Sequence, residues 1–220
     1  MPVIETQFPV LGDTLLADHG YALYSALSRL VPSLHSDESP VRIGPISGLY
    51  EGNGRLRLDR QRSRLRIRLA AEQIAVVLPL AGRSLDVDGC RIRLGVPQFR
   101  TLVPAPSLVA RMVTIKRSSR QDCAGTRAYM EPASFLERVR RELDRLEVGG
   151  DPGIPLVDDG PHAGKPRRHV MRIKDRRVVG FGLQVTGLTA EESIRVQENG
   201  LGGRKKMGCG WFAAMRENYQ

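Results

Sequence analysis

The sequence predicts an α+β fold that consists of two successive β-α-β-β-α-β units. Three observations support this fold class. Several segments alternate strictly between charged and aliphatic residues, as in residues 64–69 (RLRIRL), which is typical of strands with one buried face. Segments with apolar residues at helical spacing lie between these strands in both halves of the chain. The 220 residues also suffice for two domains of about 100 residues each.

The first two elements of the N-terminal half are a strand and a helix. Residues 3–11 (VIETQFPVL) have the composition of a strand. Asp18 is a suitable N-cap for a helix over residues 21–31, in which apolar residues recur at helical spacing. Pro32 ends or kinks this helix.

Residues 54–70 (GRLRLDRQRSRLRIRLA) contain two alternating halves and predict a two-stranded hairpin, with arginine on one face and aliphatic residues on the other. A short helix over residues 72–82 and a strand over residues 90–96 complete a ferredoxin-like (RRM-like) order of elements. Helices cover one face of such a sheet, so we expect the arginines on the open face, with Arg91 and Arg93 beside them. A polyanion would relieve their mutual repulsion.

The second half repeats this order. Its helix over residues 189–199 begins with Thr189 and Glu192, which have the spacing of a capping box. The other expected elements are a strand over 107–117, a helix over 132–147, a short strand at 154–157, a hairpin over 169–188 and a last strand near Gly210. We therefore expect two tandem domains, residues 1–97 and 98–220, with a glycine-rich loop near the C-terminus.

The net charge of +10 favours a polyanionic partner such as a nucleic acid. No run of 18 or more apolar residues and no secretory signal is visible, so we expect a cytoplasmic protein without a membrane contact. The three cysteines are widely separated, which fits free thiols in a reducing compartment. Neither the cysteines nor the four histidines have a zinc-site spacing, and we expect no metal and no cofactor.

Residues 200–212 (GLGGRKKMGCGWF) combine glycines with three adjacent cations. The motif fits neither a P-loop nor a dinucleotide-binding fingerprint. We expect its backbone N–H groups and its cations to contact phosphate. The candidate RNA-binding residues are Gly200, Gly202, Gly203, Arg204, Lys205, Lys206, Gly208 and Gly210. Valine at Gly202 or Gly208 is expected to block the approach of RNA while the fold survives.

A second basic surface lies on the predicted helix over residues 132–147. Arg138, Arg141 and Arg145 are spaced three and four residues apart and share one face. Acidic residues of the same helix offer ion-pair partners, so structural ion pairs and contact with an RNA backbone are equally good interpretations. Arg138 and Arg141 are included among the candidate RNA-binding residues.

The glycine-rich loop at the end of a double ferredoxin-like chain resembles the signature of the RAMP superfamily. More narrowly, the chain resembles the CRISPR repeat-processing endoribonucleases, through its element order, residues 200–210 and an N-terminal DHGYALYSALSRLVPSLH. This resemblance implies a protein that binds a CRISPR repeat hairpin and cuts precursor CRISPR RNA without a metal ion. Other subunits of a CRISPR effector complex are further candidate partners.

The implied reaction is attack of a ribose 2′-OH on the adjacent phosphate, which leaves a 2′,3′-cyclic phosphate and a 5′-OH. It requires a base, an acid and cations at the phosphate, and histidine suits either proton role. Members of the family carry the active histidine in or just after the first helix, which favours His35 and places His19 second. His162 and His169 are treated as bystanders. Tyr24 either orients a catalytic group or belongs to the core, and no lysine can be assigned a catalytic role.

Two other classes of function remain open. The first is a catalytically silent RNA-binding protein of the same fold that holds the repeat hairpin in an effector complex. The second is a ribosome-associated or general RNA-structural protein, which the charge allows but the glycine-rich signature disfavours.

Overall fold

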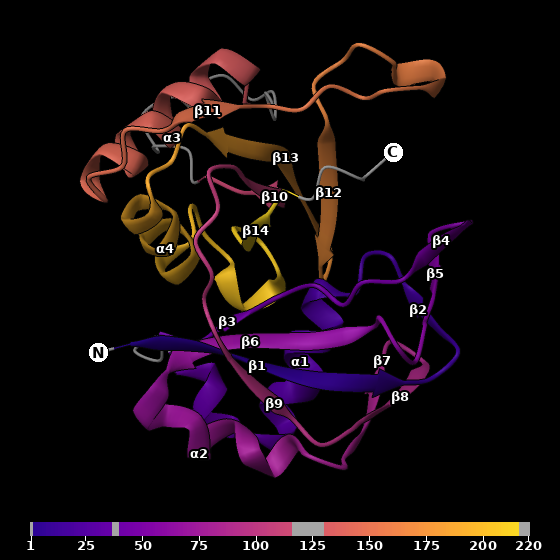
Figure 1. Cartoon of the computed structure of the whole chain (residues 1–220). Coiled ribbons are helices and arrows are strands. Elements are labelled where there is room, and N and C mark those ends of the chain that lie inside the picture. Colours follow the sequence, from indigo (N-terminus) through magenta and orange to yellow (C-terminus); the bar gives the residue numbers. More distant parts are fainter. Residues whose placement is uncertain (1, 37–39, 116–129, 216–220) are drawn as a thin grey trace. The chain divides into compact units, whose positions relative to one another are not determined.

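A computed structural model describes residues 2–36, 40–115 and 130–215 (Figure 1). It is an α+β protein with antiparallel sheets, as expected, and it forms two compact units. Unit 1 comprises Met1–Leu102 together with the short segments Met171–Arg176 and Lys205–Gly208, and unit 2 comprises the remaining residues. The main division thus falls after Leu102, whereas the sequence placed it after residue 97. The two short segments were expected in the C-terminal domain and belong to unit 1.

The main sheet of unit 1 has the strand order β3-β6-β1-β8-β7, with β9 paired to β1. The order β3-β6-β1-β8 is that of a ferredoxin-like domain, but its second strand in the chain is β3 and not the first half of the hairpin that the sequence predicted. The strands are β1 (Val3–Leu11), β3 (Arg42–Ile43), β6 (Arg64–Ala70), β7 (Ser84–Val87), β8 (Cys90–Leu94) and β9 (Gln98–Thr101).

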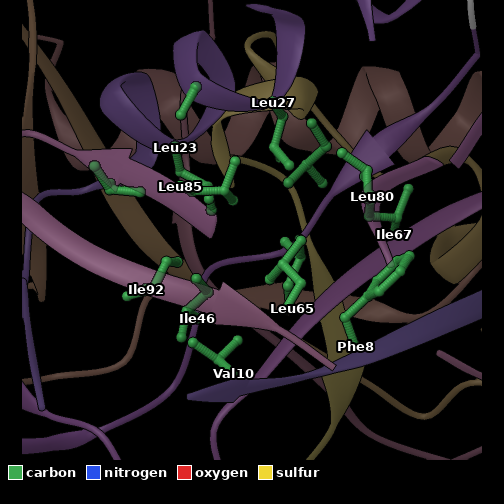
Figure 2. Close-up of a cluster of buried hydrophobic side chains, with 14 of the residues drawn as sticks. Phe8, Val10, Leu23, Leu27, Ile46, Leu65, Ile67, Leu80, Leu85 and Ile92 are labelled. Carbon is green, nitrogen blue, oxygen red and sulfur yellow. The ribbon is translucent and has the colours of Figure 1, made fainter. Parts of the chain in front are cut away.

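The helices of unit 1 are short and pack on one face of this sheet. They are α1 (Gly20–Leu30), η1 (Pro32–His35), η2 (Ala71–Gln73), α2 (Ile74–Val77), η3 (Leu78–Leu80) and η6 (Lys205–Met207). Figure 2 shows Leu23 and Leu27 of α1 directed toward the strand residues Leu65 and Ile67, and all four are fully buried. This core fixes the position of α1, which carries one half of the candidate site described below.

The predicted hairpin over residues 54–70 is wrong. Its halves, β5 (Arg55–Arg57) and β6, join different sheets: β6 pairs with β1 and β3, and β5 pairs with β2 (Thr14–Leu16) and β4 (Leu49–Gly52). A turn built on Asp59, whose carboxylate accepts the N–H groups of Gln61 and Arg62, redirects the chain between them. Alternation predicts which face a residue occupies but not which strand it pairs with.

The alternation itself is correct, although the arginines do not all face solvent. Leu65, Ile67 and Leu69 are fully buried in the core of unit 1. Arg68 on the opposite face is only 3% exposed and forms an ion pair of 3.0 Å with Glu5. The expectation of an open row of five arginines is therefore wrong at Arg68.

The sheet of unit 2 has the order β11-β13-β10-β14, which is again ferredoxin-like, and β12 pairs with β13. Its elements are β10 (Leu108–Val113), α3 (Pro132–Arg145), β11 (Asp151–Gly153), η5 (Gly160–His162), β12 (Arg168–Ile173), β13 (Arg176–Thr186), α4 (Ala190–Asn199) and β14 (Phe212–Ala214). Figure 1 shows α3 and α4 on the same side of this sheet. Buried residues of both helices, including Phe135 and Val196, form its core with Leu183 and Val185.

Most predicted features of unit 2 are present. Thr189 and Glu192 form the expected capping box, and the hairpin turns between β12 and β13. The strand expected at 154–157 is wrong, because the pairing strand is β11 and only an isolated bridge joins Leu156 to Pro166. The last two residues of the strand predicted over 107–117 lie outside the described residues. No helix in the described part of the chain is both long and apolar enough to cross a membrane.

Candidate functional site

His35 of unit 1 is exposed and its imidazole is held by Tyr24. The Tyr24 hydroxyl lies 3.0 Å from His35 Nδ1, and the two rings stack with centroids 6.0 Å apart at 15°. Among the described residues, Tyr24 is the hydrogen-bond partner of this ring, through Nδ1, and Nε2 has none. The hydroxyl fixes the orientation of the ring. When it accepts the Nδ1 proton, Nε2 is the nitrogen that can take up a proton.

The local sequence explains why these two side chains meet. Tyr24 lies in the buried face of α1 and is 9% exposed. The helix ends at Leu30, and Pro32 then begins the 3₁₀ turn η1, in which the fully buried Leu34 anchors the chain. His35 follows this anchor and is therefore directed back along α1 toward Tyr24. The sequence predicted that Pro32 ends or kinks the helix, and in the structure the 3₁₀ turn η1 begins there.

Lys206 brings a cation to the same part of unit 1. Its Nζ donates a hydrogen bond to the backbone carbonyl of Ser36, the residue after His35. The short helix η6 that carries Lys206 packs against α1 at Gly20, where a Cβ would lie 2.3 Å from the Met207 carbonyl oxygen. The absence of a side chain at Gly20 thus allows η6 to approach. Sequence reasoning placed Lys206 among the RNA-binding cations and could not place it beside His35.

His19 has a different environment from His35. It is 1% exposed, its Nδ1 lies 2.7 Å from the Leu16 carbonyl oxygen, and its Nε2 accepts the Ile46 N–H at 3.0 Å. The Leu16 carbonyl can only accept, so Nδ1 carries the proton and the ring is neutral. Both nitrogens are occupied, which gives His19 the geometry of a structural residue that joins three segments of unit 1.

We expect His19→Ala to lower the free energy of unfolding by about 2 kcal/mol or more, since it leaves a buried carbonyl and a buried N–H unpaired. Urea denaturation would measure the loss, with the exposed His162→Ala as the control. Cleavage by the folded fraction should persist. A variant that is as stable as the parent but cleaves no RNA would instead make His19 a catalytic residue.

Four of the five glycine N–H groups in the glycine-rich loop form hydrogen bonds within unit 2. Gly200, Gly202, Gly203 and Gly210 donate to Val196, Glu142, Thr114 and Met112, respectively, at 2.6–2.8 Å. The expectation that these amides serve phosphate is therefore wrong. The loop instead presents side chains: Arg204 is exposed at a φ of +59°, and Lys205 and Lys206 are half-buried in η6. Whether these cations contact RNA stays a prediction.

The glycines have a steric reason of their own. A Cβ at Gly202 would lie 2.3 Å from the Thr114 carbonyl oxygen, and one at Gly210 would lie 2.1 Å from that of Leu201. Both residues also have φ values in the left-handed region. Gly208 has more room, with its nearest neighbour 3.6 Å away in Pro45. Close packing of the loop on its own unit thus accounts for Gly202 and Gly210.

The predicted basic face of α3 lies beside the first part of the loop in unit 2. Arg138, Arg141 and Arg145 line a hollow of about 390 Å³, and Gly202 and Gly203 form its opposite wall. Arg140 lies outside it, where it pairs with Asp144 at 2.8 Å and bonds the carbonyl oxygen of Gly150. The structure thus places Arg138 and Arg141 next to the loop and adds Arg145 to them.

The chain is similar to known proteins over nearly its whole length. A family model described as Cas6 Crispr matches residues 4–217. A curated relative, the CRISPR-associated endonuclease Cas6 of Myxococcus xanthus (strain DK1622), is 38% identical over 212 residues, which cover 96% of this chain and 81% of that protein. The chain belongs to the Cas6 family.

Solved structures related to Cas6 confirm the tandem ferredoxin-like fold. A Cas6-related protein of Pyrococcus furiosus superimposes with a TM-score of 0.66 at 15% identity and covers 98% of this chain and 100% of its own. A structure described as CRISPR associated protein Cas6 gives 0.63 at 14% identity, over 98% of this chain and 99% of its own. A third structure, described as an RAMP protein binding different RNA substrates, has a TM-score of 0.62 at 14% identity. The match covers 98% of this chain and 100% of that chain.

The other two histidines of this Cas6-family chain lie in unit 2. His162 is exposed in η5. Burial, with smaller contributions from Arg111 and Arg167, lowers the pKa of His169 to about 4, so this residue is uncharged at neutral pH. Neither histidine belongs to the cluster around His35. Among the described residues, no three His, Cys, Asp or Glu side chains gather in a way that could hold a metal ion.

Proposed function

We propose that this Cas6-family chain is an endoribonuclease that binds CRISPR repeat RNA in the cytoplasm and cuts precursor CRISPR RNA into guide RNAs. The observation that carries the proposal is the exposed Nε2 of His35, whose Nδ1 is fixed by Tyr24. A relative that is 38% identical and named an endonuclease supports an enzyme over a silent binding protein. The similarly folded RAMP protein described as binding different RNA substrates supports RNA as the partner.

In the proposed reaction, His35 Nε2 takes the proton of the ribose 2′-OH. The 2′ oxygen forms a bond to the adjacent phosphorus, and the bond from phosphorus to the 5′ oxygen breaks. The 5′ oxygen takes up a proton and leaves as a 5′-OH, while the 2′,3′-cyclic phosphate remains. General-base catalysis by a positioned imidazole contributes about 10²- to 10⁴-fold to such a step.

Tyr24 and Lys206 have supporting roles in this mechanism. Tyr24 holds the ring by its hydrogen bond to Nδ1, so it is a positioning residue. Lys206 donates a hydrogen bond to the backbone carbonyl of Ser36, the residue after His35. From there its ammonium group would stabilise the extra negative charge on the phosphate oxygens in the transition state. The exposed Arg204 and the half-buried Lys205 flank Lys206 and would hold the RNA backbone.

The proposal is tested by incubating the protein with repeat RNA from the CRISPR array of its own genome. Because none of the assigned residues acts through a metal, we expect the same cleavage rate in EDTA and in magnesium. The 3′ fragment should begin with a 5′-OH, which its resistance to a 5′-phosphate-dependent exonuclease would show. The 5′ fragment should end in a 2′,3′-cyclic phosphate, which a phosphatase removes only after acid has opened the ring. A protein that binds this RNA and leaves it intact under both conditions would be the catalytically silent type, in which case an effector complex is its setting.

A further inference from the structure

We propose that the hollow between α3 and the glycine-rich loop of unit 2 binds one unpaired nucleotide of the RNA that flanks the repeat hairpin. This inference rests on RNA being the partner of the chain, and it concerns a subsite separate from His35. The hollow has the size of a small-ligand site, about 390 Å³. Its lining combines three arginines with Glu142, Ile115 and two glycines.

The wall formed by the loop is rigid before any ligand arrives. The Gly202 N–H donates to the Glu142 carboxylate at 2.6 Å. Gly203 is bonded twice to Thr114: its N–H donates to the Thr114 carbonyl at 2.8 Å, and its carbonyl accepts the Thr114 hydroxyl at 3.1 Å. Two glycines held in this way give a smooth surface that a ligand can approach closely, and little further ordering is needed on binding.

The hollow keeps an excess of positive charge. Its lining sets the single carboxylate of Glu142, which accepts the Gly202 N–H, against three arginines. Asp144 pairs with Arg140 on the other side of α3. Among the described residues, Arg141 and Arg145 have no ion-pair partner. Of the two interpretations of this helix, contact with a phosphate is therefore favoured over structural ion pairs.

The shape and chemistry of the hollow favour a single-stranded nucleotide over a duplex. A paired stem keeps its bases stacked inside and presents a convex backbone, whereas an unpaired nucleotide can enter a concave site. The planar guanidinium groups suit its phosphate and can stack on its base. Ile115, which is half-buried against the core of unit 2, gives the site an apolar surface for the ribose or base.

The experiment compares two RNAs that carry 2′-deoxyribose at the cut site, so that binding is measured without cleavage. One is the repeat stem-loop alone, and the other adds its single-stranded flanks. We expect Arg141→Ala/Arg145→Ala to weaken binding of the flanked RNA at least about 10-fold, because bonds to charged groups are removed. The slope of log affinity against log salt should fall by about 0.7 for each phosphate that the variant no longer neutralises. Affinity for the bare stem-loop should stay unchanged.

The control is Arg60→Ala/Arg62→Ala, which removes the same charge from an exposed turn of unit 1. An equal loss of affinity in the control would overturn the proposal, because a general effect of charge would then explain the result. An equal loss on both RNAs would also overturn it, because the arginines would then contact the stem. A third result would also overturn the proposal. In it, calorimetry shows that AMP binds the parent and not the Arg141→Ala/Arg145→Ala variant, yet the two proteins bind the flanked RNA equally, so that the hollow takes a nucleotide but not this RNA. Cleavage of natural RNA by the parent reports on the proposed function independently, since the binding comparison uses uncleavable RNA.

Discussion

Replacement of His35 by alanine is expected to slow cleavage of the repeat RNA by about 10²- to 10⁴-fold, the usual contribution of a general base. RNA affinity should be almost unchanged, because one exposed imidazole contributes little to an interface made of many phosphate contacts. Single-turnover cleavage with excess protein measures the first quantity, and filter binding to RNA with 2′-deoxyribose at the cut site measures the second. That RNA should bind normally and resist cleavage, since it lacks the attacking hydroxyl.

One further variant tests the positioning role of Tyr24, and another serves as a control for His35→Ala. Tyr24→Phe keeps the ring stack and removes the hydroxyl that lies 3.0 Å from Nδ1, so its rate should fall between those of the parent and His35→Ala. His162→Ala removes an exposed histidine outside the cluster and should cleave like the parent. Normal cleavage by His35→Ala, with loss of cleavage in a stable His19→Ala protein, would exchange the roles of the two histidines.

The largest loss of stability is expected for Gly210→Ala. The new Cβ would lie 2.1 Å from the backbone carbonyl oxygen of Leu201, which cannot rotate away as a side chain does. The φ of +65° adds about 1–2 kcal/mol, the cost of a left-handed backbone for a residue with a Cβ. We therefore expect a loss of at least about 2 kcal/mol in the free energy of unfolding, measured by urea denaturation.

Gly203→Ala is the matched control, because its Cβ would be 3.9 Å from the nearest atom and its φ is not in the left-handed region. Stability of Gly210→Ala equal to that of this control would contradict the steric account. The same account corrects the expectation that valine at Gly202 spares the fold, since that side chain would overlap the Thr114 carbonyl. RNA contact by the loop is better tested at Arg204 and Lys205.

The sequence predicts the fold well where elements are long or carry a strong local signal. The capping box of α4 and the arginine-leucine alternation of β6 are confirmed, because both depend on neighbours within a few residues. The small sheet of β2, β4 and β5 was missed. The alternation predicted a strand at β5 but not its partners, because β2 and β4 have only three and four residues, too few to establish a period.

The candidate site was predictable only in part, for a related reason. The position of His35 just after the first helix was enough to nominate it, and Tyr24 was noted without a definite role. Lys206 bonds the carbonyl of a residue 170 positions away, and no local pattern encodes such a contact. The burial of His19 was equally invisible, since it depends on Leu16 and Ile46 closing around the ring.

The membership of Lys205–Gly208 in unit 1 has a consequence for the synthesis of the protein. A chain grows from its N-terminus, and domains generally fold as they emerge from the ribosome. Unit 1, however, lacks η6 and Lys206 until translation has passed Gly208. A nascent chain that stops before this segment would expose His35 and Tyr24 without the lysine. Under the proposed mechanism, we expect such a chain to cleave RNA more slowly than the protein with η6 in place, even where the rest of unit 1 has folded.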